Sequence, residues 1–175
     1  TVWVGNNAMN QKIGFLFPGQ GSQRLNMGRV LALRYGWARE LLEQVDQWLL
    51  EIGAEPVADL IMRPVDQSLN EEQLSEWKTL LSQTQIAQPA ICAASLLQYK
   101  YLESLGIQPT AMGGHSLGEL TAFYAAGAFD EETLIKLAAV RGQAMAAPSG
   151  EAGTMASLWC SPKQAAALTK RVDGY

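Results

Sequence analysis

A serine stands between two glycines in the pentapeptide GHSLG at residues 114–118. This G-x-S-x-G pattern is typical of a nucleophile elbow, a sharp strand-to-helix turn that exposes a serine hydroxyl. The glycines fit such a turn because larger side chains at those positions would clash. The Ser116 Oγ would lie at a helix N-terminus, where free N–H groups favour a developing negative charge. The pattern predicts acyl chemistry at Ser116, with a glycine-rich turn that carries no nucleophile as the alternative.

A second glycine-flanked turn follows an apolar run near the start of the chain. Residues 13–17 read IGFLF and residues 18–21 read PGQG, which predicts a buried strand that ends in a tight turn. This turn would bring a backbone N–H to the same sheet edge as Ser116. Together with the N–H of Leu117 it would form an oxyanion hole, in which each donor lowers the barrier by about 3 kcal/mol. A plain β-turn is the alternative.

Arg141 is the third residue whose placement suggests chemistry. The helix predicted after Ser116 rises about nine residues before Gly127, and the returning helix reaches position 141 after about eleven residues, at about 1.5 Å per residue in both. Arg141 is therefore expected to lie level with Ser116. A guanidinium group binds carboxylates in a bidentate way, so Arg141 is interpreted either as a ligand for a substrate carboxylate or as a surface arginine paired with a nearby glutamate.

The composition excludes several other functions. The chain has 175 residues, a net charge of −4, two cysteines and one histidine. The acidic balance argues against a nucleic-acid or anionic-membrane surface. Cys92 and Cys160 are too few for a disulfide scaffold, and with His115 as the only histidine no metal site is expected. No apolar run approaches the roughly 18 residues of a membrane span and no signal peptide is evident, so we expect a cytoplasmic protein of about one domain.

Strand and helix patterns alternate along the chain, which predicts an α/β fold around a parallel sheet. The helix that begins at Ile86 is expected to hold Pro89 in its first turn and to end at Gly106. Residues 66–76 are polar and are interpreted as a surface excursion. The remaining predicted elements are helices over 23–52 with a break at Gly36, a strand over 110–112, helices over 120–126 and 131–147 with Asp130 as N-cap, a strand over 154–159 and a helix over 161–171.

Four motifs in order resemble the acyltransferase family, which comprises malonyl-CoA:acyl carrier protein transacylases and the acyltransferase domains of polyketide and polyunsaturated fatty acid synthases. The motifs are FPGQGSQ at 17–23, TQIAQPA at 84–90, GHSLGE at 114–119 and VRG at 140–142. The resemblance extends from about Ile13 to the end of the chain.

The resemblance implies a domain organisation as well as a fold. The fold would be a hydrolase-like parallel-sheet core with a nucleophile elbow, followed by the start of a small ferredoxin-like subdomain that is incomplete in this chain. Residues 1–12 would be a linker, residues 13–150 the N-terminal part of the α/β acyltransferase core, and residues 151–175 the truncated start of the subdomain.

The resemblance also assigns roles to individual residues. Ser116 would be the nucleophile that forms the acyl-enzyme ester, and Arg141 would bind the free carboxylate of the acyl group. The backbone amides of Gln20 and Leu117 would form the oxyanion hole. The remaining substrate-binding positions implied by the motifs are Gln88 and His115.

The general base of the family is absent from this chain. In the family it is a histidine far beyond the nucleophile, whereas the only histidine here is His115. Neighbouring side chains at such a turn usually diverge, so His115 is not expected to activate Ser116, and an elbow serine without a base is a poor nucleophile. We therefore expect association with the C-terminal remainder of the domain, which would supply the base.

The predicted function is transfer of a malonyl or related dicarboxylic group from coenzyme A to the phosphopantetheine thiol of an acyl carrier protein, through acyl-Ser116. No bound cofactor is expected, since malonyl-CoA is a substrate and phosphopantetheine belongs to the carrier protein. Neither nucleic acid nor membrane is an expected partner. The alternatives are an α/β-hydrolase-type esterase, which leaves FPGQGSQ and Arg141 unexplained, and an inactive scaffold fragment, which would require the lack of the catalytic histidine to be native.

Overall fold

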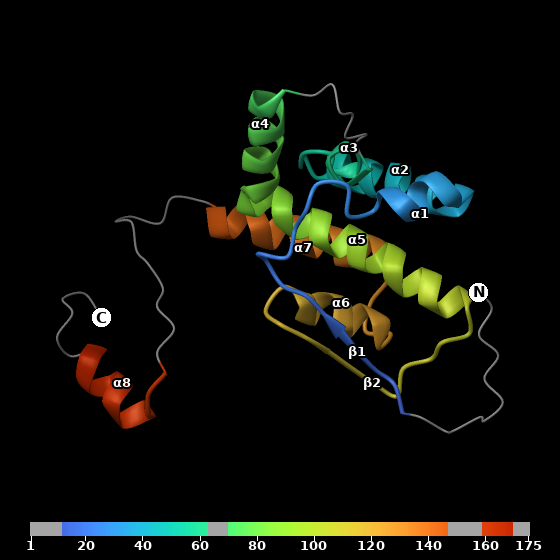
Figure 1. The fold of residues 1–175 in the computed structure, drawn as a ribbon. Helices are drawn as coiled ribbons and strands as arrows, with labels where there is room; N and C mark the ends of the chain where they lie inside the picture. Colours follow the sequence, from blue (N-terminus) through green and yellow to red (C-terminus); the bar gives the residue numbers. More distant parts are fainter. Residues whose placement is uncertain (1–11, 63–69, 147–158, 170–175) are drawn as a thin grey trace.

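The computed structural model describes residues 12–62, 70–146 and 159–169. No helix in these ranges is long and apolar enough to cross a membrane. In chain order the described elements are β1 (Gly14–Phe17), α1 (Arg29–Arg34), α2 (Gly36–Glu51), α3 (Ala58–Met62), α4 (Glu71–Ser82), α5 (Thr84–Ser104), β2 (Ala111–Gly114), α6 (Gly118–Ala125), α7 (Glu131–Ala146) and α8 (Pro162–Thr169) (Figure 1).

The two strands form a parallel pair, as the alternation of strand and helix patterns predicts. The register runs from Gly14 opposite Ala111 to Phe17 opposite Gly114. Parallel strands need a long crossover connection, and here the crossover consists of α1 to α5. Because the strands run in the same direction, their carboxyl ends meet at one edge of the sheet.

One face of β1 packs against α5. The ring centroids of Phe15 and Phe17 lie 6.1 and 6.2 Å from the ring centroid of Tyr99 on α5. Leu16, between the two phenylalanines, has the opposite orientation that a strand imposes on successive side chains and is 86% exposed. Among the described residues, then, helices cover the Phe15 face and leave Leu16 open to solvent.

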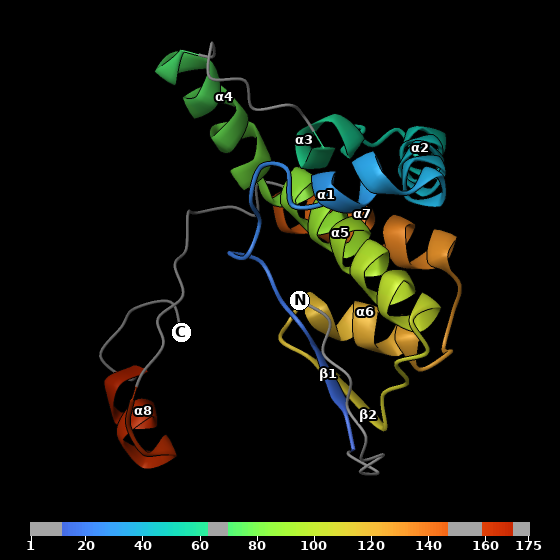
Figure 2. The same cartoon turned by 45° about the vertical axis from the view of Figure 1, so that its right-hand side comes forward.

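Helix α5 is the centre of the described fold. Figures 1 and 2 show α1, α2 and α3 on one side of α5, the sheet and α6 on the other, and α7 running alongside it. Residues 86–97 of α5 are all buried. Helices on several sides of α5 explain why it is apolar nearly all round, as expected for a core helix.

Several sequence predictions are confirmed. The strand predicted over residues 13–17 is β1, and the one predicted over 110–112 overlaps β2. The expected burial of β1 is not observed, because only Phe17 is buried and Leu16 is exposed. The break expected at Gly36 falls at Tyr35, whose extended backbone separates α1 from α2. Asp130 caps α7, because its Oδ1 accepts a hydrogen bond of 2.8 Å from the Thr133 N–H.

Other predictions require correction. Helix α5 begins at Thr84, two residues before the apolar spacing starts, so Pro89 lies inside the helix and not in its first turn. Its missing N–H removes an interior hydrogen bond.

Residues 71–76 are mainly exposed, as expected of a surface excursion, but they form the start of α4. The Asn70 side chain caps this helix by accepting a hydrogen bond from the Gln73 N–H.

The predicted C-terminal subdomain and N-terminal linker lie mostly outside the described residues. The strand predicted over 154–159 has only Trp159 in a described range, and residues 1–11 and 170–175 are likewise not described. The helix predicted from Ser161 corresponds to α8, whose side chains at positions 162–168 are exposed apart from the half-buried Ala165.

Two glycines allow the chain to turn sharply between β2 and α6. A Cβ on Gly114 would lie 2.1 Å from the carbonyl carbon of Gly118, and a Cβ on Gly118 would lie 2.1 Å from the carbonyl oxygen of Phe17. Both distances are to backbone atoms, which cannot rotate aside as a side chain can. The requirement for glycine inferred from the G-x-S-x-G pattern therefore has a direct steric cause.

We predict that Gly118→Ala destabilises the folded state by about 3 kcal/mol, because the new methyl group overlaps the backbone of β1. Chemical denaturation of the full-length protein measures the free energy of unfolding. Gly36→Ala is the matched control, because its nearest neighbour would be the Glu40 Oε1 at 4.0 Å. The control is expected to be neutral or to stabilise by up to about 1 kcal/mol. Equal stabilities for the two variants would contradict the steric argument.

Candidate active site

The two glycine-flanked turns lie beside each other at the carboxyl edge of the sheet. The His115 N–H donates to the Phe17 carbonyl oxygen at 3.2 Å, which continues the strand pairing by one bond. A Cβ on Gly19 would lie 2.5 Å from the His115 carbonyl oxygen. The expectation that both turns meet at one edge is therefore confirmed, and the contact is so close that Gly19 cannot carry a side chain.

Ser116 has the backbone geometry of an elbow residue. Its φ is +53°, in the left-handed region that costs a non-glycine residue roughly 1–2 kcal/mol. The side chain is exposed, and α6 begins two residues later with Leu117 as N-cap. The helix thus places its N-terminal N–H groups next to the serine, where they favour negative charge.

Arg141 reaches Ser116 from α7. Its Nη2 donates to the Ser116 Oγ at 3.1 Å, and its Nη1 donates to the Gln88 Oε1 at 2.7 Å. The prediction that Arg141 lies level with Ser116 is confirmed. The ion pairs within the described ranges involve only Lys100 and Lys136 as cations, so in this part of the chain Arg141 has no carboxylate partner.

Gln88 is a fully buried polar residue on α5, with 0% exposure. Its carbonyl oxygen accepts from Arg141, while its Nε2 lies 3.4 Å from the Gln20 Oε1 and 3.3 Å from the Met145 Sδ. A buried side-chain amide is costly unless its polar atoms are paired. These contacts satisfy both ends of the amide and fix the position of the arginine.

The structure adds Thr84 and Met145 to the residues that the motifs identify. The Thr84 Oγ1 accepts a 3.0 Å hydrogen bond from the Gln20 Nε2, and Met145 lies one helical turn beyond Arg141 on α7. Thr84 opens the TQIAQPA motif, so the sequence did contain a signal for it. Met145 lies four residues after Arg141, on the same helix face, which is a weaker signal.

The two N–H groups expected to form an oxyanion hole are available. Neither the Gln20 N–H nor the Leu117 N–H has a hydrogen-bond acceptor within the described ranges. The Leu117 side chain is fully buried in the core, which anchors the residue that follows Ser116. Their role as oxyanion donors remains a prediction.

His115 is exposed and lies against the other turn. Its Nδ1 is 3.0 Å from the point where a Cβ on Gly19 would stand. Within the described part of the chain His115 makes no hydrogen bond to Ser116, whose Oγ bonds to Arg141. This geometry agrees with the expectation that the base is not His115.

Within the described residues, the environment of Cys92 disfavours a nucleophilic role for this cysteine, and no metal centre is found. Burial disfavours the Cys92 thiolate and raises the pKa of Cys92 to about 12, an effect that the Thr121 hydrogen bond and the charge of Arg141 only partly offset. The Thr121 hydroxyl lies 3.7 Å from the Cys92 Sγ. In the same ranges no group of three His, Cys, Asp or Glu side chains could hold a metal ion.

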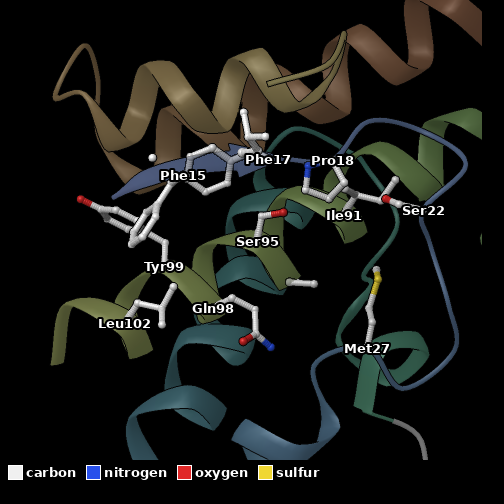
Figure 3. A pocket seen from close by; sticks show the side chains of 13 residues that line it. Phe15, Phe17, Pro18, Ser22, Met27, Ile91, Ser95, Gln98, Tyr99 and Leu102 are labelled. Atoms are coloured by element: carbon white, nitrogen blue, oxygen red, sulfur yellow. The ribbon is translucent and has the colours of Figure 1, made fainter. Parts of the chain in front are cut away.

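A cavity of about 420 Å³ lies between β1 and α5, apart from the residues that contact Ser116. Figure 3 shows Phe15, Phe17 and Tyr99 together at one end and Met27 at the other. Neither Ser116 nor Arg141 is among the residues that line it. The candidate active site therefore lies at the sheet edge and not in this cavity.

A strained, exposed serine lies between a parallel strand and a helix, next to a second strand-end turn, and this is the backbone geometry of a nucleophile elbow in an α/β protein. The chain belongs to the acyl transferase domain family, whose sequence profile matches residues 14–172. It is 35% identical over 162 residues to a PKS-NRPS hybrid synthetase of Aspergillus candidus, which covers 93% of this chain and 6% of that protein.

Solved structures of malonyl transferases share the fold. The malonyl-CoA-acyl carrier protein transacylase of Clostridium perfringens is 28% identical with a TM-score of 0.72, and the match covers 92% of this chain and 46% of that one. The acyl-carrier-protein S-malonyltransferase of Bartonella henselae is 34% identical with a TM-score of 0.63, covering 77% and 39%. The chain therefore spans less than half the length of these enzymes and a small part of its synthase relatives.

We predict that iodoacetamide at pH 8 modifies Cys160 in the native protein and leaves Cys92 unmodified. Cys160 is exposed and Cys92 is buried, and the thiolate is the reactive form. Peptide mapping by mass spectrometry distinguishes the two sites. In the control, the Cys160→Ser variant is unfolded in guanidinium, where Cys92 becomes accessible and should be modified. Native modification of both cysteines at similar rates would contradict the burial of Cys92.

Proposed function

We propose that the protein transfers a malonyl or related dicarboxylic acyl group from coenzyme A to the phosphopantetheine thiol of an acyl carrier protein. The observation that carries the proposal is the position of Arg141, which contacts the Ser116 Oγ and has no carboxylate partner in the described ranges. A cation held beside a serine nucleophile suits an acyl group that ends in a carboxylate. An esterase for simple esters would have no use for this arrangement.

In the first half-reaction, the Ser116 Oγ attacks the thioester carbonyl carbon as its proton passes to a base. The carbonyl π electrons move to oxygen, and the N–H groups of Gln20 and Leu117 stabilise this oxyanion. The intermediate collapses with cleavage of the C–S bond, and the coenzyme A thiolate takes up the proton as it leaves. In the second half-reaction the carrier thiol attacks the ester and Ser116 regains its proton.

Arg141 gains the acyl carboxylate as a partner when the acyl group binds, and it keeps its contact with Gln88. In the structure one N–H of its guanidinium contacts Ser116 and another contacts Gln88. Its remaining N–H groups have no acceptor among the described residues and suit the acyl carboxylate. Gln88 keeps its hydrogen bond to the arginine, so the guanidinium stays in place when Ser116 becomes an ester.

The proposed reaction also needs a general base and the remainder of the domain. The family resemblance assigns the base to a histidine outside these 175 residues, and the relatives are longer than this chain. The exposed Leu16 face of β1 suits coverage by further sequence. We infer that the full domain has a hydrolase-like sheet and a ferredoxin-like subdomain that begins near residue 151.

Replacement of the nucleophile gives the direct test. Ser116→Ala is expected to abolish the transfer of radiolabel from malonyl-CoA to the full-length protein, because no ester can form. Ser104→Ala is the matched control, since Ser104 lies at the exposed end of α5 and should label normally. Label that persists in Ser116→Ala at the same stoichiometry would show that another residue is the nucleophile.

Arg141→Ala tests acyl selectivity. We expect kcat/KM for malonyl-CoA to fall by about 30- to 150-fold, in line with the roughly 2–3 kcal/mol of a hydrogen-bonded charge pair, while kcat/KM for acetyl-CoA falls far less or rises. Arg39→Ala, on the exposed side of α2, should change neither value. An unchanged preference for malonyl over acetyl groups would rule out the carboxylate role of Arg141.

A further inference from the structure

The side chain of Gln20 is held at both ends by α5, although the residue belongs to the turn after β1. Its Nε2 donates to the Thr84 Oγ1 at 3.0 Å, and its Oε1 lies 3.4 Å from the Gln88 Nε2. Gln20 is exposed, so its side chain had the alternative of bonding to water. The contact of 3.0 Å is the stronger of the two by distance, and it fixes the turn to the first residue of α5.

Thr84 itself has little freedom to move. It is half-buried and is the first residue of α5. Its carbonyl oxygen would lie 2.9 Å from a Cβ on Gly142, so the backbone of α7 approaches it closely. Gly142 is the residue next to Arg141. The same threonine therefore contacts the helix that carries the arginine and the turn that carries the Gln20 N–H.

The two groups near Ser116 need a fixed separation. Arg141 must meet the acyl carboxylate, and the Gln20 N–H must meet the oxyanion at the other end of the same acyl group. Catalytic hydrogen-bond donors lose much of their effect when they are displaced by about 1 Å. A hydrogen bond that ties the Gln20 turn to the α5–α7 contact maintains that separation.

We propose that Thr84 is a positioning residue for acyl transfer, whose hydroxyl holds the Gln20 side chain and thereby aims the Gln20 backbone N–H at the oxyanion. This inference rests on the proposed function. Thr84 contacts neither Ser116 nor Arg141 through its side chain in the described residues, so it acts through Gln20.

The test measures single-turnover labelling of Ser116 by malonyl-CoA in the full-length protein. Thr84→Val keeps the size of the side chain and removes the acceptor, and its rate is expected to fall about tenfold while the KM for malonyl-CoA changes less than twofold. Thr84→Ser restores the hydroxyl and should recover the rate to within twofold. Thr79→Val, at an exposed position on α4, is the matched control and should equal wild type.

A double-mutant cycle shows whether Thr84 acts through Gln20. Gln20→Leu removes the side-chain amide and keeps the backbone N–H, so it should slow labelling about as much as Thr84→Val, and the double variant should be no slower than either single variant. Because Gln20 is on an exposed turn, this variant also gives a result if Thr84→Val fails to fold.

The outcomes separate this inference from the proposed function. The positioning role alone is overturned if the wild-type protein is labelled and Thr84→Val and Gln20→Leu are labelled at the same rate as wild type. Additive losses in the double variant would also overturn it. A rise in KM without a fall in the labelling rate would also overturn it. Absence of label on wild-type protein under conditions where a known malonyl transferase is labelled would overturn the proposed function.

Discussion

The close approach of two backbone turns at the carboxyl edge of the sheet is the constraint on which the site depends. Gly19 lies against His115, and Gly118 lies against the end of β1, with no room for a Cβ at either glycine. Such contacts fix the distance between the turns more rigidly than side-chain packing does, because backbone atoms have no rotamers. The strained φ of Ser116 persists because the surrounding backbone leaves no alternative path.

Helix α5 extends this constraint to the rest of the molecule. It is buried along most of its length and contacts helices on several sides, yet it presents Thr84 and Gln88 to the site near its first two turns. The buried amide of Gln88 links the arginine of α7 to the turn after β1. A polar network at the end of an apolar helix is satisfied only in one arrangement of its neighbours, so it specifies that arrangement.

The candidate site is predictable from the sequence because its turns follow short motifs with strict steric rules. The turn at Ser116 requires glycines. The rise of α6 from Ser116 nearly matches the return along α7 as far as position 141, which places Arg141 beside the serine. Long-range packing is harder to predict from the sequence. The apolar spacing begins at Ile86 and predicts Pro89 in the first turn of α5, whereas the polar Thr84 already belongs to the helix and contacts a residue 64 positions away.

The parallel pairing of β1 and β2 also has a consequence for the order in which the protein is made. The pairing joins positions 97 residues apart, as in the contact between Ile13 and Thr110. Contacts of such high sequence separation form late, after local helices. During synthesis from the N-terminus, β1 is made before β2, so the pairing of these two described strands waits until the chain reaches residue 114, while α1 to α5 are made. The turn at Ser116 thus forms together with the β1–β2 pairing, and the candidate site at this sheet edge is assembled in the same event.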